Sequence, residues 1–222
     1  MLVKKIVSND ASLIDYYAKR ANEYERIYEK PERQNDLAKL KELFRKTFTG
    51  HSVFEVACGT GCWTQAISQT AKSITATDFN EEVLQIVRAK KFGCEVSFQK
   101  ADAFNLSVQK NNFTAGLAAA WWSHLRKSET GNFLSQFHRQ FSSGALMVFM
   151  DNRFVPGSNT PISRTDEEGN TFQVRKLENG NEYEILKNFP DEKEAKRILA
   201  DAAVEICWTE LQYYWLLTYK LK

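Results

Sequence analysis

The order of apolar and polar residues divides the chain into a helical start, an alternating middle and a strand-rich end. Residues 11–48 are charged and rich in helix formers, with apolar side chains near helical spacing and a break at Pro31, so we expect two helices there. Short apolar or β-branched runs then alternate with amphipathic segments, and we predict a strand in each run. The five runs are 52–57, 73–77, 95–99, 113–120 and 145–150.

The amphipathic segments between these runs predict the fold class. One segment follows Asn80, which suits a helix N-cap, and carries Val83, Leu84 and Val87 on one face. A later segment places phenylalanines on one face between 133 and 141. Strands that alternate with helices indicate an α/β protein with a doubly wound, mostly parallel sheet. Parallel strands are covered on both faces, which explains why the runs are almost continuously apolar.

After residue 150 the pattern changes to polar strands and turns. Residues 171–177 and 181–187 are strand-like pieces on either side of Glu178-Asn179-Gly180, and this spacer predicts a hairpin. The runs 203–210 and 212–219 are too close together for a parallel crossover. We therefore expect them to form an antiparallel terminal pair that completes a seven-stranded sheet.

One helix is expected between the hairpin and the terminal pair. Asp191, with Glu194 three residues later, resembles a capping box that opens a helix through Leu199. The helices near the N-terminus and the hairpin together form a small helix and hairpin cap in this prediction.

Composition limits the cellular setting and the class of partner. The chain has 222 residues, 43% apolar and 26% charged, enough for a sizeable core, and its net charge of +2 is too balanced for a protein that coats nucleic acid. No secretory signal is visible in MLVKKIVSND, and the apolar stretches 116–122 and 213–219 are far shorter than the roughly 20 residues that span a bilayer. Four cysteines without a C-x-x-C pair fit a reducing compartment. We expect a soluble, cytoplasmic protein with no membrane partner.

The first candidate for chemistry is the small-residue loop that follows the run 52–57. Its glycines would let a ligand approach the backbone and let the next helix point its N-terminus at it. An NAD fingerprint would place glycines at 57, 59 and 62, whereas this chain has Ala57, Gly59 and Cys62, which weakens a dinucleotide interpretation.

Three carboxylates accompany this loop. Glu55 stands inside an apolar run, where burial is costly unless a bound ammonium group or a core arginine faces it, or unless the strand end is solvated. Asp78 follows the second run, 19 residues after Gly59, where it could accept the hydroxyls of a ribose or simply cap a helix. Asp102 follows the third run, where it could accept from an adenine amino group.

In the order E-x-A-C-G-T-G, T-D-F-N and A-D-A-F, these motifs over residues 50–155 resemble the class I S-adenosylmethionine-dependent methyltransferases, a Rossmann-like family. The closing strands match that family's terminal antiparallel pair. The resemblance implies that S-adenosyl-L-methionine is the cofactor and that the chain is a methyltransferase. It divides the predicted single domain, 1–222, into a helical cap 1–48, a cofactor-binding core 50–155, a hairpin insertion 156–190 and a C-terminal part 191–222.

The same resemblance assigns the cofactor residues. The methionine portion would lie against Glu55 and the loop after it, the ribose against Asp78, and the adenine against Phe79, Asp102 and Ala103, while the chain from Ala119 to Trp122 flanks the methionine end. The full cofactor set is Glu55, Ala57, Cys58, Gly59, Thr60, Gly61, Asp78, Phe79, Asp102, Ala103, Ala119 and Trp121. Ala57 replaces the usual first glycine, a small departure that still permits close approach.

Catalysis on this scaffold needs few side chains, because the sulfonium is already an activated donor and the protein must mainly align the acceptor and exclude water. If the acceptor is a hydroxyl or a protonated amine, His124 is the candidate base, with ordering of its loop as the alternative role. His51 and His138 are expected to be structural. Three scattered histidines without ligand spacing predict no metal site.

The acceptor site is expected between the N-terminal helices and the hairpin, which together could form a lid. Candidate acceptor-binding residues are Tyr17, Tyr24, Trp122 and Arg153. For the tyrosines, which lie near Tyr16 and Arg20, and for the tryptophan, packing in a core or lid is the alternative; for Arg153 it is a solvated loop position.

The first interpretation is therefore methyl transfer to an oxygen or nitrogen atom, less readily carbon, of a small-molecule acceptor. Nucleic-acid acceptors are disfavoured because the chain has Ala120-Trp-Trp-Ser where amino-methylating DNA enzymes carry Pro-Pro, and none of its cysteines follows a proline. The alternatives left open are a non-catalytic S-adenosylmethionine-binding module, a nucleic-acid or protein methyltransferase, and a nicotinamide-dependent oxidoreductase. The sequence does not fix the oligomeric state.

Overall fold

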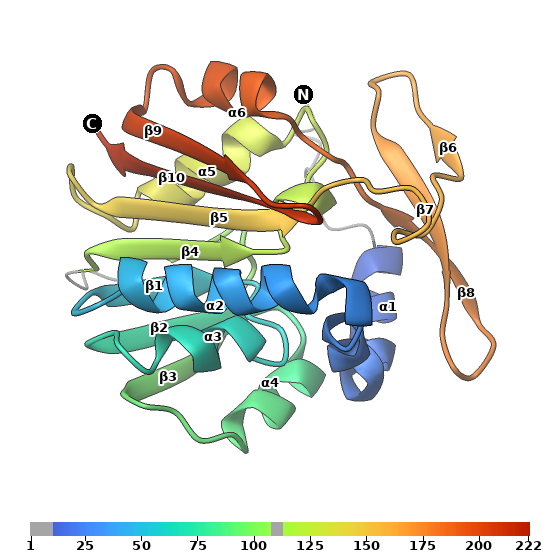
Figure 1. The fold of residues 1–222 in the computed structure, drawn as a ribbon, viewed down its shortest axis with the longest axis horizontal. Helices are drawn as coiled ribbons and strands as arrows, with labels where there is room; N and C mark the ends of the chain where they lie inside the picture. The colour runs from blue at the N-terminus through green and yellow to red at the C-terminus, as the bar shows by residue number, and fades with distance from the viewer. Residues whose placement is uncertain (1–10, 108–112) are drawn as a thin grey trace, which may run out of the picture.

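The central element is a seven-stranded sheet with the strand order β3-β2-β1-β4-β5-β10-β9 (Figure 1). The computed structural model describes residues 11–107 and 113–222. Strands β1 to β5 run parallel, whereas β10 pairs antiparallel with both β5 and β9. The strands are β1 Ser52–Val56, β2 Ser73–Asp78, β3 Glu95–Lys100, β4 Ala115–Ala119, β5 Leu146–Asn152, β9 Ala203–Glu210 and β10 Tyr214–Leu221.

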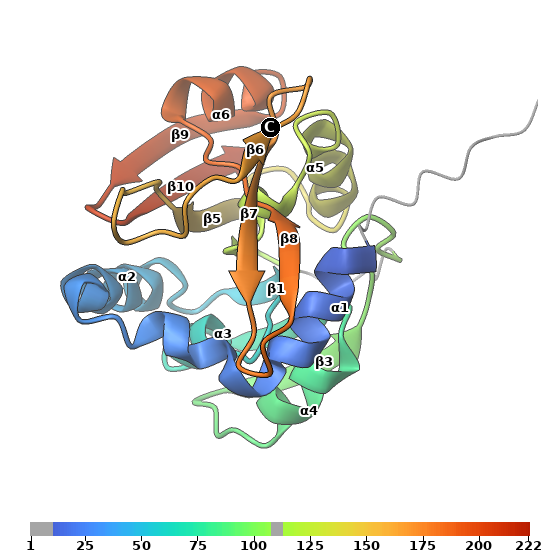
Figure 2. The same cartoon turned by 90° about the vertical axis from the view of Figure 1, so that its right-hand side faces the viewer.

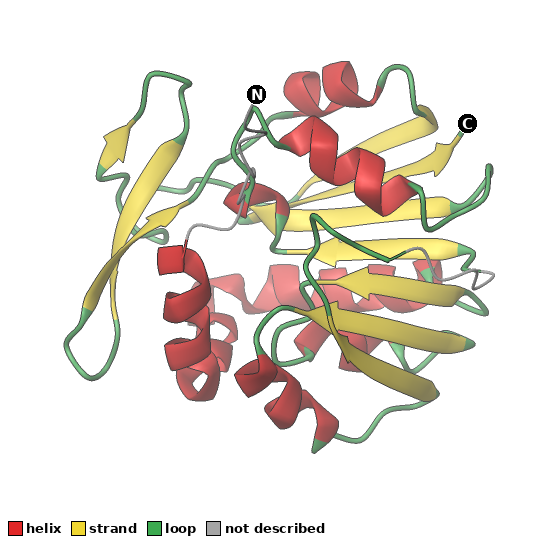
Figure 3. Cartoon of the chain, turned by 180° about the vertical axis from the view of Figure 1, so that it is seen from behind, coloured by secondary structure: helices red, strands yellow, loops and turns green. Residues whose placement is uncertain are grey.

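Helices cover both faces of this sheet, and Figure 3 shows α5 and α6 in front of it with α2 behind. The helices are α1 Ala11–Arg20, α2 Gln34–Thr47, α3 Cys62–Ile67, α4 Glu81–Arg88, α5 Thr130–His138 and α6 Glu192–Leu199. Short 3-10 segments are η1 Ala21–Tyr28, η2 Pro31–Arg33 and η3 Trp122–His124.

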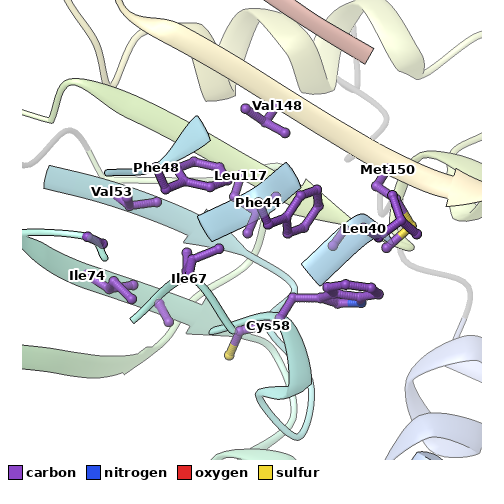
Figure 4. Close-up of a cluster of buried hydrophobic side chains, with 14 of the residues drawn as sticks. Leu40, Phe44, Phe48, Val53, Cys58, Ile67, Ile74, Leu117, Val148 and Met150 are labelled. Atoms are coloured by element: carbon purple, nitrogen blue, oxygen red, sulfur yellow. The ribbon is translucent and has the colours of Figure 1, made fainter. Parts of the chain in front are cut away.

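Two apolar clusters lie between the sheet and the helices that cover its two faces. On one face, Leu40 and Phe44 of α2 and Phe48 just after it pack against Leu117 and Met150 of the sheet, and all five are buried (Figure 4). On the other face, a phenylalanine-rich cluster joins α5 and α6 to the sheet. The removal of these side chains from water is the main driving force that holds the layers together.

The order of the strands reverses between β1 and β4. Their neighbours β2 and β5 are reached by connections that run in opposite directions along the sheet, so the chain diverges at this point. In a sheet of this type, a ligand site forms at the carboxyl ends of the strands beside the reversal.

A small antiparallel sheet stands beyond the carboxyl ends of the central strands, beside α1 (Figure 2). Its strands are β6 Arg164–Thr165, β7 Thr171–Lys176 and β8 Glu182–Leu186. A third buried cluster, Leu13 and Tyr16 of α1 with Leu177 and Ile185, holds this hairpin against the first helix. The hairpin and α1 therefore form one cover over the edge of the sheet.

The predicted fold class is confirmed, and the differences are local. The five predicted parallel strands, the hairpin and the antiparallel terminal pair are all present, with β4 shorter than 113–120 and β10 displaced toward the C-terminus. Asp191 caps α6 by accepting from the Glu194 backbone N–H at 2.7 Å, as expected. Asn80 holds the N-cap position of α4, but its side chain donates to the Ile14 carbonyl instead.

The N-terminal region has more segments than predicted. Two 3-10 turns, η1 and η2, separate α1 from α2, and η2 begins at Pro31, whose fixed φ suits the first position of a helix. Residues 1–10, which carry no visible secretory signal in the sequence, lie outside the described residues. In the part of the chain that the structure describes, no helix has the length and apolar character needed to cross a bilayer.

Candidate functional site

Two cavities meet at the carboxyl ends of β1 and β4, beneath the cover formed by α1 and the hairpin. The first cavity lies against the loops that follow β1, β2, β3 and β4. The second cavity lies between α1, the 3-10 turns, the hairpin strand β7 and Lys187, which directly follows β8. Tyr17, Tyr24, Ala120 and His124 line both, so the two cavities share one boundary.

The loop after β1 adopts left-handed backbone conformations, which glycine takes easily and other residues take only with strain. Ala57, Gly59 and Gly61 all have positive φ, at 52°, 54° and 83°. A Cβ on Gly61 would lie 2.1 Å from Val87 Cγ2, so that position has no room for a side chain. Ala57 adopts the left-handed conformation despite its Cβ, at a cost of about 1–2 kcal/mol. The small departure from glycine is therefore accommodated as strain at the site.

A second alanine in the left-handed region follows the neighbouring strand. Ala120, with φ of 56°, comes directly after β4 and lines both cavities. Strained backbone of this kind persists where surrounding structure fixes it, and it gathers at binding sites. Ala57 and Ala120 thus flank the point where the strand order reverses, and their small side chains keep the wall of the first cavity open.

Asp78 is the one carboxylate in the wall of the first cavity among the described residues. Its Oδ2 accepts from the Gly59 N–H and its Oδ1 from the Asn80 N–H, both at 2.9 Å. Burial raises the pKa of Asp78, although these backbone donors act against the shift. The carboxylate therefore ties the loop after β1 to the start of α4 and faces the cavity at the same time.

The wall of the first cavity also includes Phe79, Ala101, Ala103 and Trp121. Asp102 lies between the two alanines, and its Oδ1 accepts from the Phe104 N–H at 2.9 Å, so it orders the loop while its neighbours form the wall. The buried Nε1 of Trp121 has no hydrogen-bond partner among the described residues. An unpartnered buried donor is costly, which makes this indole a candidate donor to a ligand.

Glu55 is buried below the loop and does not line the first cavity. Its side chain is 1% exposed, and its Oε2 accepts from Thr64 Oγ1 at 2.7 Å. Burial raises the pKa of Glu55 to about 8, despite the opposing effect of the Thr64 hydrogen bond. Among the described residues no arginine forms an ion pair with Glu55, so the structure does not show the alternative of a core arginine.

Three other loop residues expected in the cofactor set serve the loop itself. Cys58 is buried, and burial raises the pKa of its thiol well above its usual value. Thr60 is buried and its hydroxyl donates to Glu25 Oε1 at 2.9 Å, while Gly61 occupies the N-cap position of α3. These residues shape the loop, and the wall of the first cavity comes from Ala57 and Gly59.

At the boundary between the cavities, Tyr17 and His124 form a hydrogen-bonded pair. His124 Nδ1 lies 2.8 Å from the Leu186 carbonyl oxygen, which can only accept, so Nδ1 carries the proton. Nε2 then accepts from the Tyr17 hydroxyl at 2.8 Å. Burial, with Lys187 and Arg175 nearby, holds the pKa of His124 well below its usual range, and burial raises the pKa of Tyr17. Both groups are therefore neutral near pH 7.

The second cavity has a cationic wall that the sequence patterns did not reveal. Arg33, from η2, and Lys187, just after β8, are 5% and 3% exposed. Lys187 Nζ lies 3.0 Å from Asp151 Oδ1 at the end of β5 and donates to Ser123 Oγ at 2.5 Å. This buried ion pair fixes the end of the hairpin to the central sheet.

Two expected acceptor-binding residues lie elsewhere. Trp122 is 3% exposed and packs edge-on against Phe149 and Trp215, because η3 turns its ring into the core while Trp121 faces the first cavity. Arg153 lines neither cavity: it pairs with Glu210 at 3.0 Å and donates to the Leu211 carbonyl. Trp122 and Arg153 therefore line neither of the two cavities, whereas Tyr17 and Tyr24 lie in the walls of both.

The remaining histidines lie away from both cavities. His51 Nδ1 is 2.9 Å from Thr114 Oγ1, and His138 Nε2 is 2.7 Å from the Tyr219 hydroxyl. Within residues 11–107 and 113–222, no three His, Cys, Asp or Glu side chains are grouped so that they could hold a metal ion.

The central part of the chain is similar to known methyltransferase sequences. Residues 53–144 match the family model of a methyltransferase domain. The demethylmenaquinone methyltransferase of Lactococcus lactis subsp. lactis (strain IL1403) is 31% identical over 88 residues, which are 36% of this chain and 35% of that protein. The demethylmenaquinone methyltransferase of Staphylococcus epidermidis (strain ATCC 12228 / FDA PCI 1200) is 29% identical over 110 residues, 46% of this chain and 43% of that protein. The chain thus spans less than half the length of these curated relatives.

Solved structures resemble nearly the whole chain. The DhpI-SAH complex has a TM-score of 0.75 at 24% identity and covers 95% of both chains. The DhpI-SAM-HEP complex has a TM-score of 0.77 at 22% identity, over 95% of this chain and 99% of that one. The magnesium protoporphyrin IX methyltransferase (ChlM) from Synechocystis PCC 6803 with bound SAM has a TM-score of 0.64 at 14% identity, over 97% and 99%. At these identities the likeness is one of fold, and it includes the cap and the hairpin.

Proposed function

We propose that this chain, which belongs to the class I S-adenosylmethionine-dependent methyltransferases, binds S-adenosylmethionine in the first cavity and transfers its methyl group to an oxygen or nitrogen atom of a small molecule in the second cavity. The observation that carries this proposal is the shared boundary at Tyr17, Ala120 and His124. A donor in one cavity and an acceptor in the other would meet there, as transfer between two bound molecules requires.

The described residues fit the cofactor. Small side chains form much of the wall of the first cavity, and a Cβ on Gly59 would lie 3.9 Å from Tyr24 Cε1, so a ligand can approach the backbone closely. Asp78 offers a carboxylate to ribose hydroxyls, and Trp121 has an unpaired indole N–H. Similar structures named as SAM or SAH complexes support the same assignment.

The roles in the cofactor site follow the positions. Asp78 accepts from the ribose, while Phe79, Ala103 and the loop held by Asp102 surround the adenine. Ala57 and Gly59 face the methionine portion, and Ala119 and Trp121 flank it. Glu55 balances the amino group of the methionine portion from below the loop, since a cation nearby would favour its ionised form.

The cofactor supplies a methyl group already activated by a sulfonium, so the chain's own part is to align the acceptor and keep water out. The cover formed by α1 and the hairpin closes over the boundary between the cavities. Where the acceptor must lose a proton, we assign this to the Tyr17 and His124 pair: the Tyr17 oxygen accepts the proton and its own proton moves to His124 Nε2.

The direct test is an acceptor screen with a methyl-labelled donor. Pools of small molecules are incubated with the full chain and with Asp78→Asn, and labelled products are separated from the donor. We expect a labelled small molecule with the wild-type chain and a strong reduction with the variant. If the wild-type chain binds S-adenosylhomocysteine but labels no acceptor, including nucleic acid and protein, the chain is a non-catalytic binding module instead.

A further inference from the structure

We propose that the acceptor carries an oxyanion, of the phosphate, phosphonate or carboxylate type, and that Arg20, Arg33 and Arg175 bind this group in the second cavity. This inference rests on the proposed function, because it takes the second cavity as the acceptor site. It adds the chemical class of the acceptor, which the fold does not specify.

The charges that line the second cavity all have one sign. Among the described residues, six cationic side chains contribute to its wall and no Asp or Glu does. The six are Arg20, Lys30, Arg33, Arg175, Lys176 and Lys187. A concave site lined by one sign of charge attracts and concentrates ligands of the opposite sign.

Some of these cations already have partners within the protein. Lys187 forms its buried ion pair with Asp151. Lys30 donates to the Ser158 carbonyl, and Lys176 is exposed at the end of β7. The ligand charge must therefore be balanced chiefly by the guanidinium groups.

The three arginines are held in place by neutral groups. Arg175 Nη2 donates to Gln173 Oε1 at 2.8 Å, and Arg33 Nε donates to Ser158 Oγ at 3.0 Å. The Arg20 guanidinium lies over the rings of Tyr16 and Tyr24, at 5.4 and 5.5 Å from their centroids. Within the described part of the chain, no carboxylate lies within ion-pair distance of any of these three.

Burial makes this arrangement costly without an anion. Removing a cation from water is unfavourable unless a counter-charge is near, yet Arg33 is 5% exposed. The neighbouring lysines show the same unfavourable environment. Burial and the nearby charges of Arg175 and Arg33 lower the pKa of Lys187, and burial and the charge of Arg33 lower the pKa of Lys30. A bound oxyanion would relieve this repulsion and accept bidentate hydrogen bonds from guanidinium groups.

The position of the cationic side chains also favours a small-molecule acceptor over a nucleic acid. A surface that binds nucleic acid spreads its cations over an exposed face, whereas here the arginines converge on one cavity from α1, η2 and β7. The cavity continues to Tyr17 and His124 at the boundary with the first cavity. An acceptor held by its oxyanion among the arginines could therefore present another part of itself, or one of its charged oxygens, to the donor.

The test is calorimetric titration of the full chain, with and without S-adenosylhomocysteine, with inorganic phosphate and separately with acetate, against sodium chloride at equal ionic strength. Phosphate represents tetrahedral anions and acetate planar ones. We expect saturable binding of one or both, and a loss of affinity of about tenfold or more in Arg175→Gln and in Arg20→Gln, since each removes a charge-assisted contact. Arg20 is partly exposed, so its variant checks the result if Arg175→Gln is poorly folded.

Arg164→Gln is the matched control, because Arg164 lies in the same small sheet but pairs with Glu184 at 2.7 Å outside the cavity. It should bind the anion as the wild-type chain does. The inference is overturned if neither anion binds more tightly than chloride, or if all three variants bind alike. Its failure is distinct from that of the proposed function, since a chain that binds S-adenosylhomocysteine but no oxyanion loses only the inference, and one that binds oxyanion but no S-adenosylhomocysteine loses the proposed function.

Discussion

The two cavities that meet at Tyr17 and His124 differ in charge and in how the chain builds them. The first has a single carboxylate, Asp78, and a wall of small and apolar side chains. The second has six cations and no carboxylate among the described residues. Under the proposed function, a positively charged donor would suit the first cavity and a negatively charged acceptor the second, so the difference in charge would help to orient the two reactants.

Their construction differs in the same way. Residues of the first cavity come mainly from loops that directly follow β1, β2, β3 and β4, so the sheet fixes them. The cations of the second come from α1, the 3-10 turns and the hairpin, which lie far apart in the sequence, and side-chain packing joins the hairpin to α1. The first cavity is thus part of the central fold itself, while the second belongs to elements added to it.

The largest effect is expected from adding one methyl group to the loop of the first cavity. Gly61→Ala forces a Cβ to within 2.1 Å of Val87 Cγ2 at a φ of 83°, and should lower the free energy of unfolding by about 2–5 kcal/mol. Gly180→Ala, in the hairpin turn, has a similar φ of 88° but no neighbour within 4 Å, and should cost about 1–2 kcal/mol. Urea unfolding measures both, and equal losses would show that the loop is not tightly packed.

This contrast explains how much the sequence could predict. Gly59 and Asp78 form one local motif, since a strand end fixes each of them, and both lie where their spacing predicted. Arg33 and Arg175 look like ordinary surface charges in the sequence, and only the docking of the hairpin on α1 brings them to one cavity. Local patterns therefore reveal the first cavity, and long-range packing decides the second.

Single side chains also show where sequence patterns stop. Trp121 and Trp122 are adjacent, and only the turn η3 decides that the first faces the cavity while the second enters the core. Arg153 follows the end of a strand, a position typical of binding residues, but it forms an ion pair with Glu210 of the antiparallel terminal pair. The position of Glu55 in an apolar strand is visible in the sequence, but its hydrogen bond with Thr64 is visible only in the structure.

The next effect concerns the pH dependence of stability below the first cavity. The folded-state pKa of Glu55 is about 8, above its usual value of 4.5, so the folded protein retains a proton that the unfolded chain loses. The stability that protonated Glu55 contributes is fully present below pH 4.5 and is lost as the pH rises through 8. The total loss in unfolding free energy is roughly a few kcal/mol. The unfolding free energy of the wild-type chain should therefore fall relative to that of Glu55→Gln, whose side chain does not titrate, between pH 5 and 9.5, and parallel curves would contradict this.

At the boundary, Tyr17→Phe removes the hydroxyl that donates to His124 while keeping the ring. Turnover with an acceptor that must lose a proton should fall about 10- to 100-fold, with affinity for S-adenosylhomocysteine unchanged. Tyr183→Phe is the control, since that hydroxyl contacts Lys19 and Asp15 away from both cavities. Steady-state kinetics that fall equally in both variants would assign Tyr17 to packing alone.

The smallest effect is expected at Arg153. Its ion pair with Glu210 is partly exposed, and such pairs contribute about 0.2–1 kcal/mol. Arg153→Gln should therefore change the unfolding free energy slightly and leave the KM for the acceptor unchanged. A clear rise in KM would return Arg153 to the acceptor site and blur the boundary between the two cavities.

Calorimetric titration with S-adenosylhomocysteine is the decisive experiment on the proposed binding of the cofactor in the first cavity through Asp78. The wild-type chain should bind with a Kd of micromolar order, which corresponds to a binding free energy of roughly −8 kcal/mol. Asp78→Asn should weaken binding about 10- to 100-fold, while Asp201→Asn, an exposed aspartate remote from both cavities, should bind normally. Absence of binding by the wild-type chain, or equal affinity in Asp78→Asn with its fold intact by circular dichroism, would contradict the account.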